Sequence, residues 1–244
     1  MQKLLILLSL ISNVDPKTIH FNEHDTVNIR GVINSESSNK FIKDLNEFNH
    51  DELHIFINSP GGSVMEGMKI ISHIDMLNDT VKINCIADFA ASMAFIIFQN
   101  CHNRYVLSSS ILMQHQMSLG LEGNLFNINS YMKMIQNLNM DLDTKQATRL
   151  QLTYDEFVDK IRHDWWITGS EAIKENVADD LVKVKCSQDL YKKKEIINYE
   201  SLFGNVILEF YKCPLLRKPT SSNTYDEFLS ENYINGKLHI KSYY

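Results

Sequence analysis

The stretch INSPGGSVMEGMKII, residues 57–71, decides the fold class of this chain. It begins as the end of an apolar strand, turns at Ser59-Pro60-Gly61-Gly62, and continues with apolar residues at helical spacing. A strand, a glycine turn and a helix form the repeating unit of a parallel sheet covered by helices. The glycine pair also offers a backbone N–H that no side chain obstructs, which is what a developing oxyanion requires.

The same alternation of strand and helix continues on both sides of this stretch. Apolar alternation or short apolar runs predict the strands, and apolar residues on one face predict the helices. The fold class is therefore α/β, with a mostly parallel sheet and helices packed on it. The predicted strands cover residues 26–33, 53–57, 81–87, 105–107, 111–113 and 181–184, and the predicted helices cover residues 38–48, 64–77, 92–98, 154–162 and 170–176.

A long helix without Gly or Pro is predicted over residues 124–152, where the sequence changes character. Its apolar face is expected to project from the globular body and to be buried against another subunit. From residue 187 the pattern loosens, which indicates a carboxy-terminal extension at residues 187–244. The residues of the apolar face are Ile128, Tyr131, Met132, Ile135, Leu138 and Leu142.

The composition limits what the chain can bind. A formal net charge of −6 argues against a nucleic-acid surface, which needs clustered Lys and Arg. The four cysteines are scattered without a CxxC pair, so we expect reduced thiols in a cytoplasmic protein and no metal site. Residues 1–18 form an apolar amino-terminal segment, for which packing on the protein and export as a signal peptide are both open.

Three residues are candidates for nucleophilic catalysis. Ser92 follows a strand and begins an apolar helix, a position from which a serine can reach a histidine base. His115 ends an apolar strand, and Asp164 lies between His163 and Trp165, where a carboxylate can orient an imidazole. Each has a plainer interpretation, since a serine at that place caps helices and a lone histidine is often structural.

Four motifs in order resemble the proteolytic subunit of Clp protease. They are Asn58-Ser59-Pro60-Gly61-Gly62 with Gly67-Met68, Ala90-Ala91-Ser92-Met93, Met113-Gln114-His115-Gln116, and His163-Asp164 followed by Glu171-Ala172. The resemblance runs from about Thr26 to Val184 and implies a ClpP/crotonase-like spiral of ββα units with a projecting handle helix at residues 124–152. It makes residues 19–186 a serine peptidase domain.

The resemblance also implies roles for individual residues. Ser92 would be the nucleophile, His115 the general base and acid, and Asp164 the orienting carboxylate. Backbone N–H groups of Gly62 and Met93 would form the oxyanion hole. The segment Gly120, Leu121, Glu122 and Gly123 would line the substrate channel, and no metal or cofactor is implied.

The activity implied is that of an ATP-dependent-type serine endopeptidase. Such an enzyme cleaves unfolded polypeptides inside stacked homo-oligomeric rings, with an AAA+ unfoldase ATPase as partner. Three alternatives remain: a catalytically impaired structural or regulatory subunit, a crotonase-type acyl-thioester enzyme, and a membrane-associated peptidase with a lysine base. The complete Ser, His and Asp set disfavours the second, and His115 disfavours the third.

Two positions depart from the pattern of the family. Asp88 stands where the family has Gly, and Met117 stands where Pro commonly follows the His-Gln pair. The Asp88 carboxylate either opposes oxyanion formation or faces solvent, where water and salt screen it. We therefore expect Asp88→Gly to raise turnover by less than about tenfold, which corresponds to about 1.4 kcal/mol of barrier.

Overall fold

The computed structural model describes residues 15–201, 204–216 and 220–222. Its main sheet has seven strands, of which six run in the order β1-β7-β5-β4-β3-β2, while β6 pairs with β5 alone. All neighbours on the six-strand path are parallel, and β6 is antiparallel to β5. The strands are β1 (Lys17–Phe21), β2 (Thr26–Arg30), β3 (Glu52–Ser59), β4 (Lys82–Ala91), β5 (Asn103–Gln114), β6 (Trp165–Thr168) and β7 (Asp180–Cys186).

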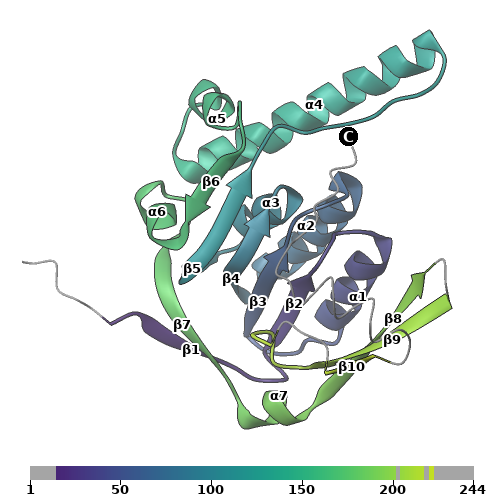
Figure 1. The fold of residues 1–244 in the computed structure, drawn as a ribbon. Coiled ribbons are helices and arrows are strands. Elements are labelled where there is room, and N and C mark those ends of the chain that lie inside the picture. The colour runs from purple at the N-terminus through teal and green to yellow at the C-terminus, as the bar shows by residue number, and fades with distance from the viewer. Residues whose placement is uncertain (1–14, 202–203, 217–219, 223–244) are drawn as a thin grey trace, which may run out of the picture.

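Three helices cover one face of this sheet (Figure 1). They are α1 (Ser35–Asn46), α2 (Val64–Asn78) and α3 (Met93–Gln99). Strand β4 lies in the middle and nearly all its residues are buried, as expected for a parallel strand with both faces covered. The predicted α/β fold with a mostly parallel sheet is confirmed, and its alternation of strands and helices is consistent with the ClpP/crotonase fold.

A second apolar cluster covers the opposite face. Phe21, Phe56 and Ile86 from the sheet pack with Leu190 and Cys213 of the carboxy-terminal extension. Helix α7 (Gln188–Lys192) begins the extension, and β8 (Lys194–Ser201), β9 (Gly204–Tyr211) and β10 (Ser221–Ser222) form a separate antiparallel sheet. The described part of the extension therefore covers this second cluster, and its strand β8 also lies beside α1, where Glu195 pairs with Lys40 at 3.6 Å (Figure 1).

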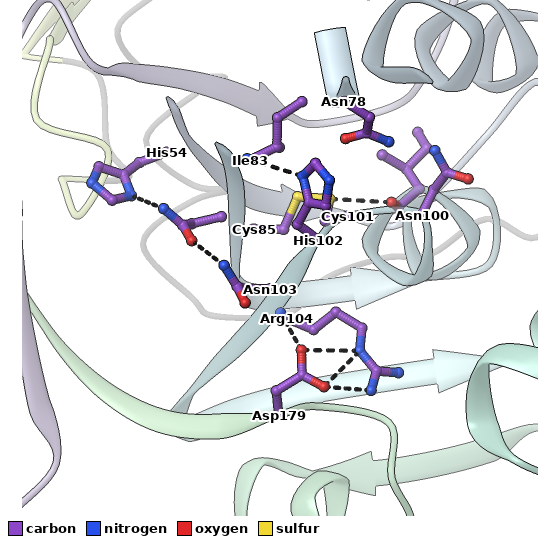
Figure 2. The surroundings of a disulfide bond; sticks show 12 residues. His54, Asn78, Ile83, Cys85, Asn100, Cys101, His102, Asn103, Arg104 and Asp179 are labelled. Carbon is purple, nitrogen blue, oxygen red and sulfur yellow. Dashed lines mark hydrogen bonds and ion pairs between the residues drawn. A yellow bond between two sulfur atoms is a disulfide. The ribbon is translucent and has the colours of Figure 1, made fainter. Parts of the chain in front are cut away.

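The cysteines correct an expectation from the sequence. All four are paired, as Cys85–Cys101 and Cys186–Cys213, so the prediction of reduced thiols is wrong for this structure. Cys85 lies in β4 and Cys101 follows α3, so this bond links the strand before Ser92 to the end of the helix after it (Figure 2). This pair could not be predicted from the spacing of the cysteines, because Cys85 and Cys101 come together only when α3 returns the chain to β4.

A buried arginine strengthens the same region. Arg104 in β5 is 2% exposed, and its guanidinium donates to Asp179 at 2.6 Å (Figure 2). It also donates to Gln99 at 2.6 Å. A third bond reaches the carbonyl of Asn176. Charge-assisted bonds of this kind are among the stronger ones in proteins, and here they connect α3, β5 and the turn before β7.

The long predicted helix is present as α4 (Leu125–Leu150), with the Asn124 side chain capping its first turn. Its buried residues all lie between Leu142 and Leu150, where α4 packs on α3 and on α5 (Tyr154–Lys160). The earlier turns extend beyond the sheet (Figure 1). Of the six predicted face residues, Leu142 alone is buried, and the other five are half-buried or exposed.

Other differences from the predicted elements are local. Strand β4 runs on to Ala91 instead of ending at residue 87, and the two short strands near residues 105–113 are one strand, β5. Strands β1 and β6 were not predicted; α6 (Gly169–Lys174) follows β6. The predicted segment of residues 1–18 lies mostly outside the described residues. Among the described helices none is long and apolar enough to cross a membrane.

Candidate active site

Ser92 occupies the sharp turn between β4 and α3. Its backbone has φ 55° and ψ −122°, a conformation that a residue with a Cβ rarely adopts. Although Ser92 is the N-cap residue of α3, its side chain makes no capping hydrogen bond. Ser92 therefore takes the N-cap position without capping the helix through its side chain, and its hydroxyl is available for another partner.

That partner is His115, at the end of β5. The Nε2 atom of His115 lies 2.8 Å from Ser92 Oγ, within ordinary hydrogen-bond distance. The backbone N–H of Ser92 also donates to the carbonyl of Met113 at 2.9 Å, two residues before the histidine. Because β4 and β5 are neighbouring parallel strands, this bond holds the serine in register with the imidazole.

The glycine pair lies against this turn. Gly61 has φ 90°, and a Cβ at this position would come within 2.6 Å of the Ala91 carbonyl and 2.8 Å of Ser92 Cβ. Gly62 forms an isolated parallel bridge with Ile33, whose two bonds are donated by Ile33 and Ser63. The N–H of Gly62 is not used in that bridge. Gly62 and Met93 both line the cavity beside Ser92.

Asp164 lies next to His115 in the strand register but is not bonded to it. The β5–β6 ladder ends with Gln114 opposite Trp165, so His115 and Asp164 leave the ladder at the same place. Asp164 is exposed, and within the described chain neither its carboxylate nor His115 Nδ1 makes a hydrogen bond. The structure thus brings Ser92 and His115 together and leaves Asp164 adjacent and unengaged.

A cavity of about 80 Å³ opens beside Ser92 and His115. Residues 120–123, predicted to line a substrate channel, form an exposed segment just before α4 and do not line this cavity. Met117, in place of the family's Pro, does line it. The other lining residues are Gly62, Val64, Met93, Ile96, Gln114, Gln116, Ser118, Asn139, Leu142 and Asp143.

Asp88 does not face solvent, which corrects one of the two expectations for this residue. It is 4% exposed and its Oδ2 accepts a bond of 3.0 Å from the Asn58 side chain. In the β3–β4 ladder the register skips Asp88, so it is the extra residue of a β-bulge. Asp88 is also unpaired on the β5 side, where residues 107–110 of β5 are skipped as well. The carboxylate is thus a fixed part of the sheet that carries Ser92.

Sequence reasoning missed three polar residues of α4 near the site. Asn139 and Asp143 line the cavity, and Asn139 Nδ2 donates to Asp143 Oδ2 at 2.7 Å. Gln146, one turn later, accepts a bond of 2.6 Å from Gln114, the residue before His115. The helix was interpreted through its apolar face alone, whereas the spacing of 139, 143 and 146 already placed these residues on one face.

The fold and this geometry define a parallel α/β protein with a serine and histidine paired at the ends of adjacent strands. The chain belongs to the Clp protease family, whose model matches residues 15–185. It is similar to a protein named ATP-dependent Clp protease proteolytic subunit 2 from Tropheryma whipplei (strain Twist). The two are 27% identical over 134 residues, which cover 54% of this chain and 73% of the relative. The suspected family is confirmed.

Proposed function

We propose that this protein is a serine endopeptidase that cleaves unfolded polypeptides. The observation that carries the proposal is the Ser92–His115 pair, with Nε2 at 2.8 Å from a serine hydroxyl that makes no capping bond. A serine is a weak nucleophile until an adjacent base accepts its proton, and this pair supplies that base. Membership of the Clp protease family supports the choice of a peptide bond as substrate.

The reaction follows from the positions of these groups. In the productive tautomer the Ser92 hydroxyl donates to His115 Nε2, which takes the proton as Oγ attacks the scissile carbonyl carbon. The resulting oxyanion would accept bonds from the N–H groups of Gly62 and Met93. The imidazolium then gives its proton to the leaving amine, and water hydrolyses the acyl-enzyme by the same sequence with His115 again as base.

The chamber and its partner are also part of the proposal. The outer turns of α4 carry Tyr131, Met134 and Met140 in exposed positions, which suits a surface buried between subunits of stacked homo-oligomeric rings. Polypeptide would enter past residues 120–123. An AAA+ unfoldase ATPase is proposed because the relative from Tropheryma whipplei is named as a subunit of an ATP-dependent protease. A cytoplasmic location stays a prediction.

The test is covalent labelling of the full chain by a fluorophosphonate probe, with mass spectrometry of the labelled peptide. We expect Ser92 to be modified, and Ser92→Ala to abolish both labelling and peptide hydrolysis while assembly is unchanged. Hydrolysis by purified Ser92→Ala at the wild-type rate would overturn the proposal.

A catalytically impaired subunit is the second candidate, and one observation favours it. The carboxylate expected to orient His115, that of Asp164, is exposed and makes no hydrogen bond in the described chain. An imidazole without this partner is a poorer base because its tautomer is not fixed. Wild-type protein that assembles but shows no label at Ser92 would select this candidate.

A further inference from the structure

One buried carboxylate of the site has no part in the mechanism above. Asp143 is 6% exposed, lies on α4 and lines the same cavity as Ser92 and His115. Its Oδ2 accepts the bond from Asn139, and no cation contacts it among the described residues. Oδ1 has no hydrogen-bond partner there either. Oδ1 is not fully buried, so it is open to the cavity and can accept a hydrogen bond from a ligand bound there.

The cavity combines polar side chains, those of Gln114, Gln116, Ser118 and Asn139, with apolar ones. Val64, Met93, Ile96 and Leu142 supply apolar side chains, and Met117 adds a flexible one. An acidic group beside these apolar side chains matches a ligand side chain that has an alkyl stem and a cationic end. Lysine has this form, with a four-carbon stem and a compact ammonium that donates three hydrogen bonds.

We propose that Asp143 makes this peptidase select substrates with lysine next to the scissile bond, whose ammonium would bind Asp143 Oδ1 when the carbonyl lies at Ser92. This inference rests on the proposed function, because it assumes that an acyl group is presented to Ser92. Asp143 is a specificity-determining residue here, and it takes no proton from the reacting atoms.

The ionisation of Asp143 gives the preference a pH dependence. Burial raises the pKa of Asp143 to about 6, although the bond from Asn139 acts in the opposite direction. The carboxyl is therefore charged above about pH 6 and increasingly neutral below it, whereas a lysine ammonium stays charged throughout this range. The preference for lysine should be present near pH 8 and fade towards pH 5.

Other charged groups near Asp143 are few. His115 is the only other titratable residue lining the cavity, and α3, which packs on α4, contains no charged residue. The charged residues of α5, which also packs on α4, are Asp155, Glu156, Asp159 and Lys160; none lines the cavity, and Lys160 is paired with Glu175. Protonation of His115 lowers the rate for every substrate alike, so it cancels in a ratio of two substrates.

The experiment uses two peptidyl diphenyl phosphonates that differ only at the residue mimicking the scissile position, lysine in one and norleucine in the other. Each forms a bond from Ser92 Oγ to phosphorus and releases phenol, so no later hydrolysis step is needed. We expect wild type at pH 8 to react faster with the lysine probe, and Asp143→Asn to lower the lysine-to-norleucine ratio of labelling rate constants by about tenfold or more. The ratio in wild type should also fall as pH decreases through about 6.

Asp141→Asn is the matched control, because Asp141 is exposed on the same helix and does not line the cavity; its ratio should equal that of wild type. A wild-type preference for norleucine, or a ratio that neither Asp143→Asn nor pH changes, would overturn the inference while labelled Ser92 still supports the peptidase. If Asp143→Asn does not fold, the pH profile of wild type alone decides. Absence of any label at Ser92, including by a fluorophosphonate, would overturn the proposed function and this inference together.

Discussion

The fold positions one side of the candidate active site, Ser92 and His115, more firmly than the other side, Asp164. Ser92 and His115 come from adjacent parallel strands in the middle of the sheet, and a backbone bond of 2.9 Å from Ser92 to Met113 fixes their register. Asp164 precedes β6, a strand of four residues that pairs with β5 alone, and it is exposed. The central sheet thus builds the nucleophile and base within one chain, whereas orientation of the base depends on a short outer strand.

The largest effect should come from the firmly held side. We expect His115→Ala to lower hydrolysis by at least about a thousandfold, because a serine without its base is hardly nucleophilic and the two residues act as a unit. The measurement is kcat/KM on a fluorogenic peptide for His115→Ala, Ser92→Ala and the double variant. All three should share one residual rate. A double variant much slower than either single variant would show that Ser92 and His115 contribute independently, against the paired geometry.

The sequence predicted that Ser92, His115 and the Gly61-Gly62 turn each follow a strand, and parallel strands bring their carboxyl ends to one edge of the sheet. The strand before Ser92 is longer than predicted, since β4 runs on to Ala91 instead of ending at residue 87. The fold class followed from the same alternation. Neither inference required any knowledge of side-chain contacts.

What the sequence did not predict depends on tertiary contacts between distant segments. The disulfides join cysteines 16 and 27 residues apart, and no spacing rule identifies such pairs. Strand β6 contains two tryptophans in four residues and was not predicted, because its strand character comes from pairing with β5. Asp143 was not singled out from the sequence, because its burial follows from the packing of α4 over the cavity.

A smaller effect is expected from the loosely held side. Asp164→Asn keeps the size of the side chain and removes the charge that would fix the tautomer of His115. Since the structure shows no bond between them, we expect kcat to fall by about tenfold to a hundredfold, well below the loss in His115→Ala. His163→Asn is a control on the preceding exposed residue and should leave kcat unchanged. If Asp164→Asn lowered kcat as much as His115→Ala, Asp164 would be positioned as firmly as Ser92 and His115 during catalysis.

Disrupting assembly tests whether contacts between subunits help to position Asp164. Ile135 is half-buried on the outer turns of α4, and an aspartate there would carry a charge into the proposed contact between subunits. We expect light scattering to show smaller particles for Ile135→Asp than for wild type. If assembly orders the segment of Asp164, Ile135→Asp should also lower kcat by about tenfold, and adding Asp164→Asn should lower it little further.

Lys133→Asp, at an exposed position of the same helix, serves as the control for added negative charge. Particles of one size for wild type and Ile135→Asp would contradict the assembly surface. Smaller particles with unchanged kcat would instead show that Asp164 is positioned within a single chain, and the difference between the two sides would then be a property of each subunit.

The smallest effect on activity is expected at Asp88, which belongs to the firmly held side. Because Asp88 is buried and bonded to Asn58, Asp88→Gly removes an acceptor from the half-buried Asn58 amide. A fully buried unmet donor costs about 1–3 kcal/mol and a half-buried one less, so the denaturant midpoint should fall modestly. The labelling rate at Ser92 should rise by less than about tenfold, as expected for the loss of a charge outside the cavity. Asp88→Asn separates the two effects, since it removes the charge and keeps an oxygen that can accept the bond. If Asp88→Asn were stable and raised the labelling rate at Ser92 far more than tenfold, the carboxylate would oppose the oxyanion directly. The sheet would then lower the activity of Ser92 as well as hold this serine in position.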